Sequence, residues 1–302
     1  MSETPVARRA ASAEPVVEAY PRRVAAPAPG GPLALPLPGP QGPLAGVQSY
    51  LLKVWAIAVV ELQKLRHDQW DVVTRSVQPV LWLLLFGNVF GRLRVLPPGL
   101  GSYLDFVAPG ILAQSVMTIA IFQGIMLIWE RDQGTLQKFL VTPVPRSVLV
   151  LGKGLGTGFR GVVQAFTITV LALLLGVHFS TDPLAWLGVV LVVFLGANFF
   201  STLSLIIAAL VRSRERVQGL GQLILMPLFF ASNALYPTSI MPDYVAILTT
   251  LNPLSYMVDA LRTLMIAGSP SHFGLGLDLL VLGVTNVLIV VTAARLYPRV
   301  VR

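Results

Sequence analysis

The sequence predicts an all-α integral membrane protein with six transmembrane helices. Hydrophobic residues make up 55% of its 302 residues and charged residues only 12%, whereas soluble domains carry about 25% charged residues. Long uncharged runs recur along the chain. So few charged side chains cannot cover a water-facing surface, which excludes an ordinary soluble protein.

Six apolar runs are predicted to cross the bilayer, because a transmembrane helix needs about 20 residues. Most of these runs are uncharged; the last contains only Asp278, and the first is short and includes polar ends. The runs are 77–90, 106–128, 161–179, 184–211, 217–241 and 275–294. A further run, 244–258, is too short to cross and is interrupted by Asn252-Pro253, so we expect a re-entrant outer segment packed on protein.

The first 46 residues differ from the rest in composition. They contain ten of the 23 prolines and one aromatic residue. A stretch of this kind cannot bury enough apolar surface to offset the entropy lost on ordering. We therefore expect residues 1–46 to form a disordered Pro/Ala-rich cytoplasmic tail, and 47–302 to form the membrane domain.

An amphipathic helix is predicted at 47–67, before the first span. We expect it to lie in the membrane interface, although a cytoplasmic helix packed on another subunit would have the same pattern. Its apolar side comprises Leu51, Val54, Trp55, Ala58, Leu62 and Leu65, and its polar side comprises Lys53, Glu61, Lys64, Arg66 and His67.

The placement of basic residues predicts the orientation. With both termini in the cytoplasm, fourteen Lys and Arg residues after the tail fall on the inner side, against Arg92, Arg94 and Arg262 outside. Inner loops of membrane proteins are rich in Lys and Arg. Because these residues are divided among four short segments, they do not form the single basic patch that nucleic-acid binding would need.

The chain shows no energy-transducing or catalytic motif of its own. It has no cysteine and no Gly-x4-Gly-Lys-Ser/Thr loop for nucleotide phosphates. The five longer spans have no Asp, Glu or His near their middles, and Asp105 and Asp278 are expected near water at span ends. Arg160 is expected to reach toward the interface, and contact with a substrate is the alternative. We therefore expect no catalytic residue, metal site or bound cofactor in this chain.

The segment 129–146 has the composition of a docking element. It opens with the charged residues Glu130, Arg131 and Asp132, continues through a short amphipathic helix with Leu136 and Phe139, and stops at two prolines. This arrangement suits insertion into a groove of a cytoplasmic partner. A solvated loop with local ion pairs is the alternative.

Several motifs together resemble the membrane subunits of type-2 ABC exporters. They are Glu-Arg-x-x-Gly-Thr at 130–135, Thr-Pro-x-x-Arg at 142–146, Gly-Lys at 152–153, and Leu-Asn-Pro-Leu-Ser-Tyr at 251–256 followed by Asp259 and Arg262. The resemblance covers about 47–298, and it is greatest to the bacterial drug and antibiotic subgroup typified by daunorubicin-resistance permeases.

The resemblance implies a permease of the bacterial cytoplasmic membrane that exports amphipathic small molecules. Two copies, as a homodimer, would act with two copies of a separate ATPase that binds Mg-ATP. Export of a lipid-linked polysaccharide, teichoic acid or glycolipid is the alternative within the family. A non-transporting membrane scaffold or an intramembrane enzyme is the alternative outside it.

The resemblance also assigns roles to three groups of residues. The coupling element would comprise Glu130, Arg131, Asp132, Gly134, Leu136 and Phe139. The outer cap would comprise Asn252, Pro253, Tyr256, Asp259 and Arg262, with the last two placed one turn apart to pair. The candidate substrate cavity comprises Met117, Phe122, Met126, Met226, Phe229, Phe230 and Asn233, whose adaptable side chains suit an apolar pocket.

Overall fold

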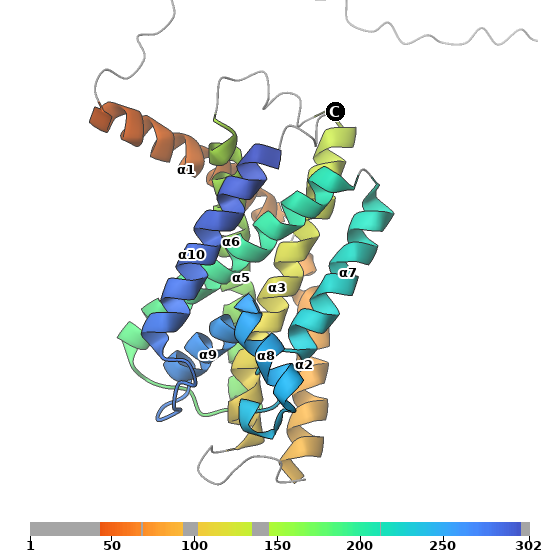
Figure 1. The fold of residues 1–302 in the computed structure, drawn as a ribbon, viewed down its shortest axis with the longest axis vertical. Helices are drawn as coiled ribbons and strands as arrows, with labels where there is room; N and C mark the ends of the chain where they lie inside the picture. The colour runs from red at the N-terminus through yellow and green to blue at the C-terminus, as the bar shows by residue number, and fades with distance from the viewer. Residues whose placement is uncertain (1–42, 68, 93–101, 135–144, 212, 297–302) are drawn as a thin grey trace, which may run out of the picture. The chain divides into compact units, whose positions relative to one another are not determined.

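The computed structural model describes residues 43–67, 69–92, 102–134, 145–211 and 213–296. Within these ranges the chain is helical and contains no strand, which confirms the all-α class (Figure 1). The elements are α1 (Pro43–His67), α2 (Gln69–Arg92), α3 (Tyr103–Asp132), α5 (Arg146–Leu174), α6 (Pro183–Leu210), α7 (Arg214–Phe230), the 3-10 turn η1 (Thr238–Ile240), α8 (Asp243–Leu251), α9 (Pro253–Met265) and α10 (Leu275–Leu296). Since α1 begins at Pro43, it includes the last residues assigned to the tail; the rest of the tail lies outside the described residues.

Four helices in the described part of the chain are long and apolar enough to cross a membrane. They are α3, α5 from Ser147, α6 and α10, and they overlap the predicted spans at 106–128, 161–179, 184–211 and 275–294. The other two predicted spans fall on α2 and α7 and do not meet the same standard of length and composition. The chain is thus a multi-pass membrane protein, and the count of six spans stays a prediction.

Two predicted spans wrongly continue past the end of the helix that contains them. α5 begins well before 161 and ends at Leu174, because Gly176 adopts a φ of +90° and the N–H of Val177 bonds the carbonyl of Ala172 at 3.0 Å. This is a glycine-terminated helix end. α7 ends at Phe230 instead of continuing to 241.

Two side chains hydrogen-bond the backbone carbonyl groups at the C-terminal end of α7, where the helix ends before the predicted boundary. The amide of Asn252 donates to the carbonyl of Leu228 at 2.6 Å, and the Ser232 hydroxyl donates to that of Phe229 at 2.7 Å. The end of a helix leaves such carbonyl groups without intrahelical partners. The end of α7 at Phe230 therefore depends in part on Asn252, which lies in a later part of the chain. Hydrophobic periodicity does not reveal such a contact.

α3 occupies the centre of the bundle, where it packs against α2, α5, α6, α7 and α9 (Figure 1). It has no charged residue between Asp105 and Glu130, and residues on all its faces are buried, including Val107, Val116 and Met117 at 0–1% exposure. A helix that is apolar all round is expected to be buried. α10 is more peripheral and exposes Leu280, Val284, Val287, Leu288 and Val291.

Glycines set the distances between α5 and its neighbours. A methyl group at Gly152 would lie 2.6 Å from Cβ of Ile57 on α1, and one at Gly154 would overlap the amide oxygen of Asn198 on α6. Small residues of this kind let helix backbones approach closely. The Gly-x-x-x-Gly pairs of α5 thus pack helices within one subunit.

The segment 244–258 is broken at the expected position. α8 ends at Leu251 and α9 begins at Pro253. Between them, the side-chain oxygen of Asn252 accepts the N–H of Leu254 at 3.0 Å. An Asn N-cap followed by proline in the first helical position is a favoured start for a helix.

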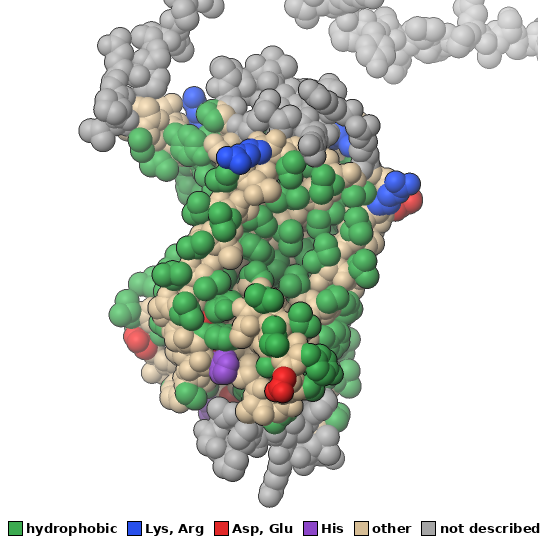
Figure 2. Space-filling view, in the orientation of Figure 1, with side chains coloured by type: hydrophobic (Ala, Val, Ile, Leu, Met, Phe, Trp, Pro, Cys, Tyr) green, Lys and Arg blue, Asp and Glu red, His purple; other side chains and the backbone are tan. Residues whose placement is uncertain are grey.

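Figure 2 shows charged side chains toward the two ends of the described bundle on this face, with hydrophobic side chains covering the surface between them. This distribution suits a protein whose middle lies in hydrocarbon.

Candidate functional site

Five charged side chains from three helices meet at the end of the bundle that carries α1. Glu130 of α3 accepts from Lys64 of α1 at 2.7 Å and from Lys153 of α5 at 2.5 Å. Glu61 of α1 lies 2.9 Å from Lys64, 3.4 Å from Lys153 and 3.3 Å from Arg160 of α5. We call these five residues the charge cluster. It joins α1, α3 and α5 at a single point.

Close helix packing brings the cluster together. Val54, Ala58 and Glu61 share the buried face of α1, which lies against the glycine-rich half of α5. A methyl group at Gly156 would overlap Cβ of Glu61, so a glycine is needed there for the carboxylate to reach Lys153. The assignment of Glu61 to a polar side of α1, away from Val54 and Ala58, was therefore wrong, since it is 4% exposed and shares their buried face.

Arg160 joins the cluster from α5. Its guanidinium bonds the carboxylate of Glu61 at 3.3 Å and lies near the Glu61 carbonyl oxygen at 3.5 Å. Lys153 lies two turns earlier on α5, and its side chain is 4% exposed. Arg160 is therefore part of an ion-pair network that joins α5 to α1.

The cluster holds its α1 members in their charged forms. Burial acts to raise the pKa of Glu61, but the charges of Lys153, Lys64 and Arg160 outweigh it and hold that pKa below the usual 4.5. For Lys64, burial acts to lower the pKa, and the carboxylates of Glu61 and Glu130 outweigh it and raise that pKa. Removing one member would leave buried charges without partners, which is strongly destabilising.

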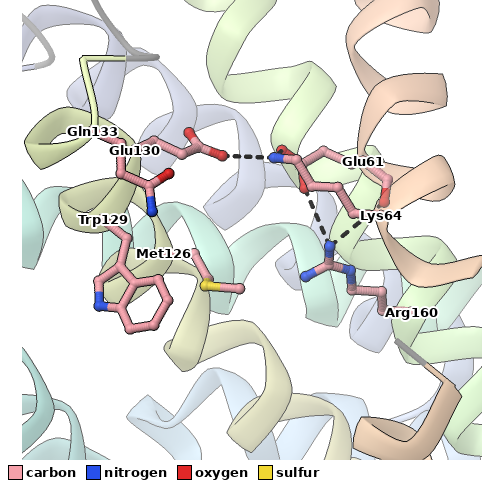
Figure 3. Close-up of a pocket in the computed structure, with 7 residues that line it drawn as sticks. All are labelled: Glu61, Lys64, Met126, Trp129, Glu130, Gln133 and Arg160. Atoms are coloured by element: carbon pink, nitrogen blue, oxygen red, sulfur yellow. Dashed lines mark hydrogen bonds and ion pairs between the residues drawn. The ribbon is translucent and has the colours of Figure 1, made fainter. Parts of the chain in front are cut away.

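A cavity of about 150 Å³ opens beside the cluster. Figure 3 shows side chains of α3 on one side and those of α1 and α5 on the other. Trp129 and Met126 present apolar surface there, at 46% and 38% exposure. The lining residues are Glu61, Lys64, Met126, Trp129, Glu130, Gln133 and Arg160.

The charged start of the predicted coupling element belongs to the last turn of α3. Glu130 points into the cluster, whereas Arg131 and Asp132 pair with each other at 3.2 Å on the surface. Gly134 follows the helix with a φ of +72°, and its N–H bonds the carbonyl of Arg131 at 3.0 Å. Few residues other than glycine adopt that φ readily. The remaining members, Leu136 and Phe139, lie outside the described residues.

The predicted substrate-cavity residues separate into two groups. Met117, Phe229 and Asn233 are buried inside the bundle at 0–2% exposure, and the ring of Phe122 lies 4.6 Å from the Arg75 guanidinium carbon. Met126, Met226 and Phe230 are 36–42% exposed on the surface of this chain. Among them, Met126 lines the cavity beside the cluster.

Among the predicted outer-cap residues, Asp259 and Arg262 were expected to pair with each other, but each has other hydrogen-bond partners. Tyr256 donates to the carbonyl of Thr250 at 2.7 Å. Arg262 donates to the carbonyls of Phe106 and Asn233 at 3.2 and 2.8 Å, and its guanidinium carbon lies 3.9 Å from the Phe106 ring centre. The expected pairing of Asp259 with Arg262 is replaced by these contacts and by separate partners for Asp259.

Asp259 instead binds the loop that follows α9. Its carboxylate accepts from the hydroxyl of Ser271 at 2.8 Å and from the backbone N–H groups of His272 and Phe273 at 2.9 Å each. The expectation that Asp278 lies close to water was also wrong, because it is 0% exposed. Spacing along α9 does not reveal either arrangement.

Replacement of Glu61 tests the cluster. Glu61→Gln leaves three cations around a neutral side chain, so we expect the free energy of unfolding in detergent at neutral pH to fall by about 3–5 kcal/mol. The pKa of Glu61 is lowered in the folded chain, so its contribution is complete above the unfolded-state pKa and is lost as the pH falls through the folded-state pKa. The difference from wild type should therefore shrink below pH 4.5.

Thermal unfolding followed by circular dichroism measures this difference. Glu215→Gln is the matched control, because Glu215 is exposed on α7, and it should change stability by less than about 0.5 kcal/mol. Equal effects of the two substitutions would contradict the role of the cluster.

Comparison with known proteins places this site in a described family. The ABC-2 type transporter family model matches residues 53–266, which include the whole charge cluster and α9. The chain is 28% identical over 216 residues to the daunorubicin resistance ABC transporter permease protein DrrB1 of Streptomyces coeruleorubidus, covering 72% of this chain and 75% of that protein. It is 27% identical over 213 residues to the inner membrane transport permease YadH of Escherichia coli K12, covering 70% and 81%. It is 28% identical over 204 residues to the putative transport permease ycf38 of Cyanophora paradoxa, covering 67% and 70%. The chain belongs to the ABC-2 type transporter family, as a membrane permease component.

Proposed function

We propose that the chain is the permease subunit of an ATP-driven exporter of amphipathic small molecules, coupled to a separate ATPase. The observation that carries the proposal is the charge cluster, which ties the last turn of α3 to α1 and α5 immediately before the segment 135–144. Membership of the ABC-2 type transporter family supports the pairing with an ATPase.

The cluster suggests how the ATPase would act on the membrane helices. The ATPase would bind the segment 135–144 through Leu136 and Phe139, and ATP binding would displace the adjoining last turn of α3. Glu130 bonds Lys64 and Lys153, so a displacement of that turn would pull on α1 and α5 together. Glu130 then transmits force within the permease, whereas Leu136 and Phe139 make the contact with the ATPase.

The full assembly would contain two permease copies as a homodimer and two ATPase copies, with Mg-ATP bound by the ATPases. The permease would lie in the bacterial cytoplasmic membrane, with six spans formed by α2, α3, α5, α6, α7 and α10 and with both termini inside. The excess of Lys and Arg in the segments assigned to the inner side supports this orientation.

Drug-like amphiphiles are the substrate class we favour. One relative is named for daunorubicin resistance, and the candidate cavity residues are mainly Met and Phe, which suit adaptable apolar pockets. Export of a lipid-linked polysaccharide, teichoic acid or glycolipid is the second candidate, since members of one fold differ in substrate.

Reconstituted transport tests the proposal. Because this chain has no nucleotide-binding loop, we expect the purified permease in proteoliposomes to leave daunorubicin, used as a fluorescent probe, unmoved. Adding the ATPase and Mg-ATP should start transport, and an uncoupler that collapses the pH gradient should leave it running. Movement driven by an imposed pH or sodium gradient alone would contradict the assignment. Movement of a lipid-linked glycan and not of daunorubicin would favour the second candidate.

Two substitutions separate force transmission from partner binding. Glu130→Gln breaks two ion pairs inside the permease, so we expect transport to be lost while the ATPase still co-purifies. Phe139→Ala removes an anchor from the interface and should weaken ATPase binding about thirty-fold, equivalent to about 2 kcal/mol. Glu215→Gln serves as the control with normal transport. Normal transport by the Glu130 and Phe139 variants would remove the case for coupling through this segment.

Cysteine labelling tests the orientation, with no background because the chain has no cysteine. Asp182→Cys and His272→Cys replace exposed residues on the proposed outer side, and Glu215→Cys replaces one on the proposed inner side. An impermeant thiol reagent added to intact cells should label the first two and spare the third. The reverse pattern would overturn the orientation.

A further inference from the structure

A carboxyl group is buried without a hydrogen-bond donor at the end of the bundle opposite the charge cluster. Asp278 lies in the first turn of α10 and is 0% exposed. Neither of its carboxyl oxygens has a hydrogen-bond partner among the described residues. An ionised carboxylate in such a place would lose its hydration with nothing to replace it, which costs far more than burying the neutral acid.

The neighbouring carboxyl group, that of Asp259, is in the opposite situation. It is 1% exposed and accepts from the Ser271 hydroxyl and from the N–H groups of His272 and Phe273 at 2.8–2.9 Å. Hydrogen bonds from several donors favour the charged form of a carboxyl group. The loop 266–274 thus surrounds Asp259 as it would surround an anion.

α9 and α10 pack together, and among the described residues the carboxyl group of Asp259 lies within interaction distance of that of Asp278. Two adjacent buried carboxylates repel each other, so such a pair holds one proton in common. The donors assign the charge to Asp259 and the proton to Asp278. A protonated Asp278 can donate to Asp259, which satisfies its own hydroxyl and adds one more donor to the anion.

The other charged groups on the surrounding elements have their own partners. Arg262 of α9 bonds the carbonyls of Phe106 and Asn233. The ring of His272 lies 3.3 Å from the Thr238 hydroxyl, and Asp182, before α6, accepts the N–H of Leu184. α6 itself has no charged residue, and the basic residues Lys153 and Arg160 of α5 lie in the charge cluster.

We propose that Asp278 and Asp259 form a proton-binding site that fastens α9 and the loop 266–274 to α10. The bound proton makes this attachment sensitive to pH. Losing it would place two anions side by side between α9 and α10, and the loop held by Asp259 would loosen from α10. The site does not depend on the proposed function or on an ATPase partner.

Infrared spectroscopy of the whole purified chain tests for the proton directly. We expect wild type at neutral pH to show the carbonyl band of a protonated carboxyl group, shifted on transfer to D2O. Asp278→Asn should abolish that band while keeping a side-chain donor toward Asp259. Asp259→Asn removes the neighbouring negative charge but leaves Asp278 buried, so the band should remain at neutral pH or below and disappear at a lower pH than in wild type. Absence of the band from wild type overturns the proposal, whether or not either variant folds.

Thermal unfolding between about pH 5 and about pH 9 provides the second readout. Wherever Asp278 keeps its proton in the folded chain and is ionised in the unfolded chain, the unfolded state binds fewer protons, so stability falls as the pH rises until the folded chain loses the proton as well. Asp278→Asn should remove this part of the fall. His272→Gln is the control for histidine titration and should retain it.

A resident cation in place of the proton would give a different result. In that case the unfolding temperature of wild type would rise with sodium or potassium at constant ionic strength, and no protonated carboxyl band would appear. That outcome overturns the proposal, as does an equal pH dependence in wild type and Asp278→Asn.

Discussion

The buried carboxylate of Glu61 and the partly buried carboxylate of Glu130, placed among three cations, fix the relation between α1, α3 and α5. A buried charge is tolerated only when its partners are in place, so Glu61 and Glu130 constrain three helices far apart in sequence to meet at one point. The glycines of α5 make this meeting possible, since a side chain at Gly156 would displace Glu61. The docking of α1, the position of the last turn of α3 and the cavity beside Trp129 all depend on this constraint.

The sequence was sufficient for the class of the fold and for most helix positions, because uncharged runs and helix-breaking residues act locally. The break at Asn252-Pro253 is an example: the Asn cap and the proline sit together in sequence and start α9. It was not sufficient for Glu61. Charged residues on an amphipathic helix are ordinarily assigned to water, and the burial of Glu61 depends on cations from α5. The spacing Val54, Ala58, Glu61, set against the glycine-rich start of α5, was the available signal.

The same limit explains the contacts of Asp259 and Arg262 at the other end of the bundle. Asp259 and Arg262 are one turn apart, which favours an ion pair on an isolated helix. In the folded chain, Arg262 instead satisfies the carbonyls of Phe106 and Asn233, and Asp259 binds a loop that begins after α9. These partners come from distant segments, so only the tertiary structure decides between them. The proton on Asp278 also depends on tertiary contacts. The loop 266–274 donates hydrogen bonds to Asp259, and none of the described residues donates one to Asp278.

α3 connects the two ends. Near its start, the ring and carbonyl of Phe106 hold Arg262 of α9, and in its last turn Glu130 holds Lys64 and Lys153. Between these points the helix is uncharged, and every residue from Asp105 to Met117 is buried. Closely packed interiors transmit displacement because they have little free volume. A shift of α3 along its axis therefore changes the charge cluster and the Arg262 contacts together, so that the two ends of the bundle are mechanically linked through one helix.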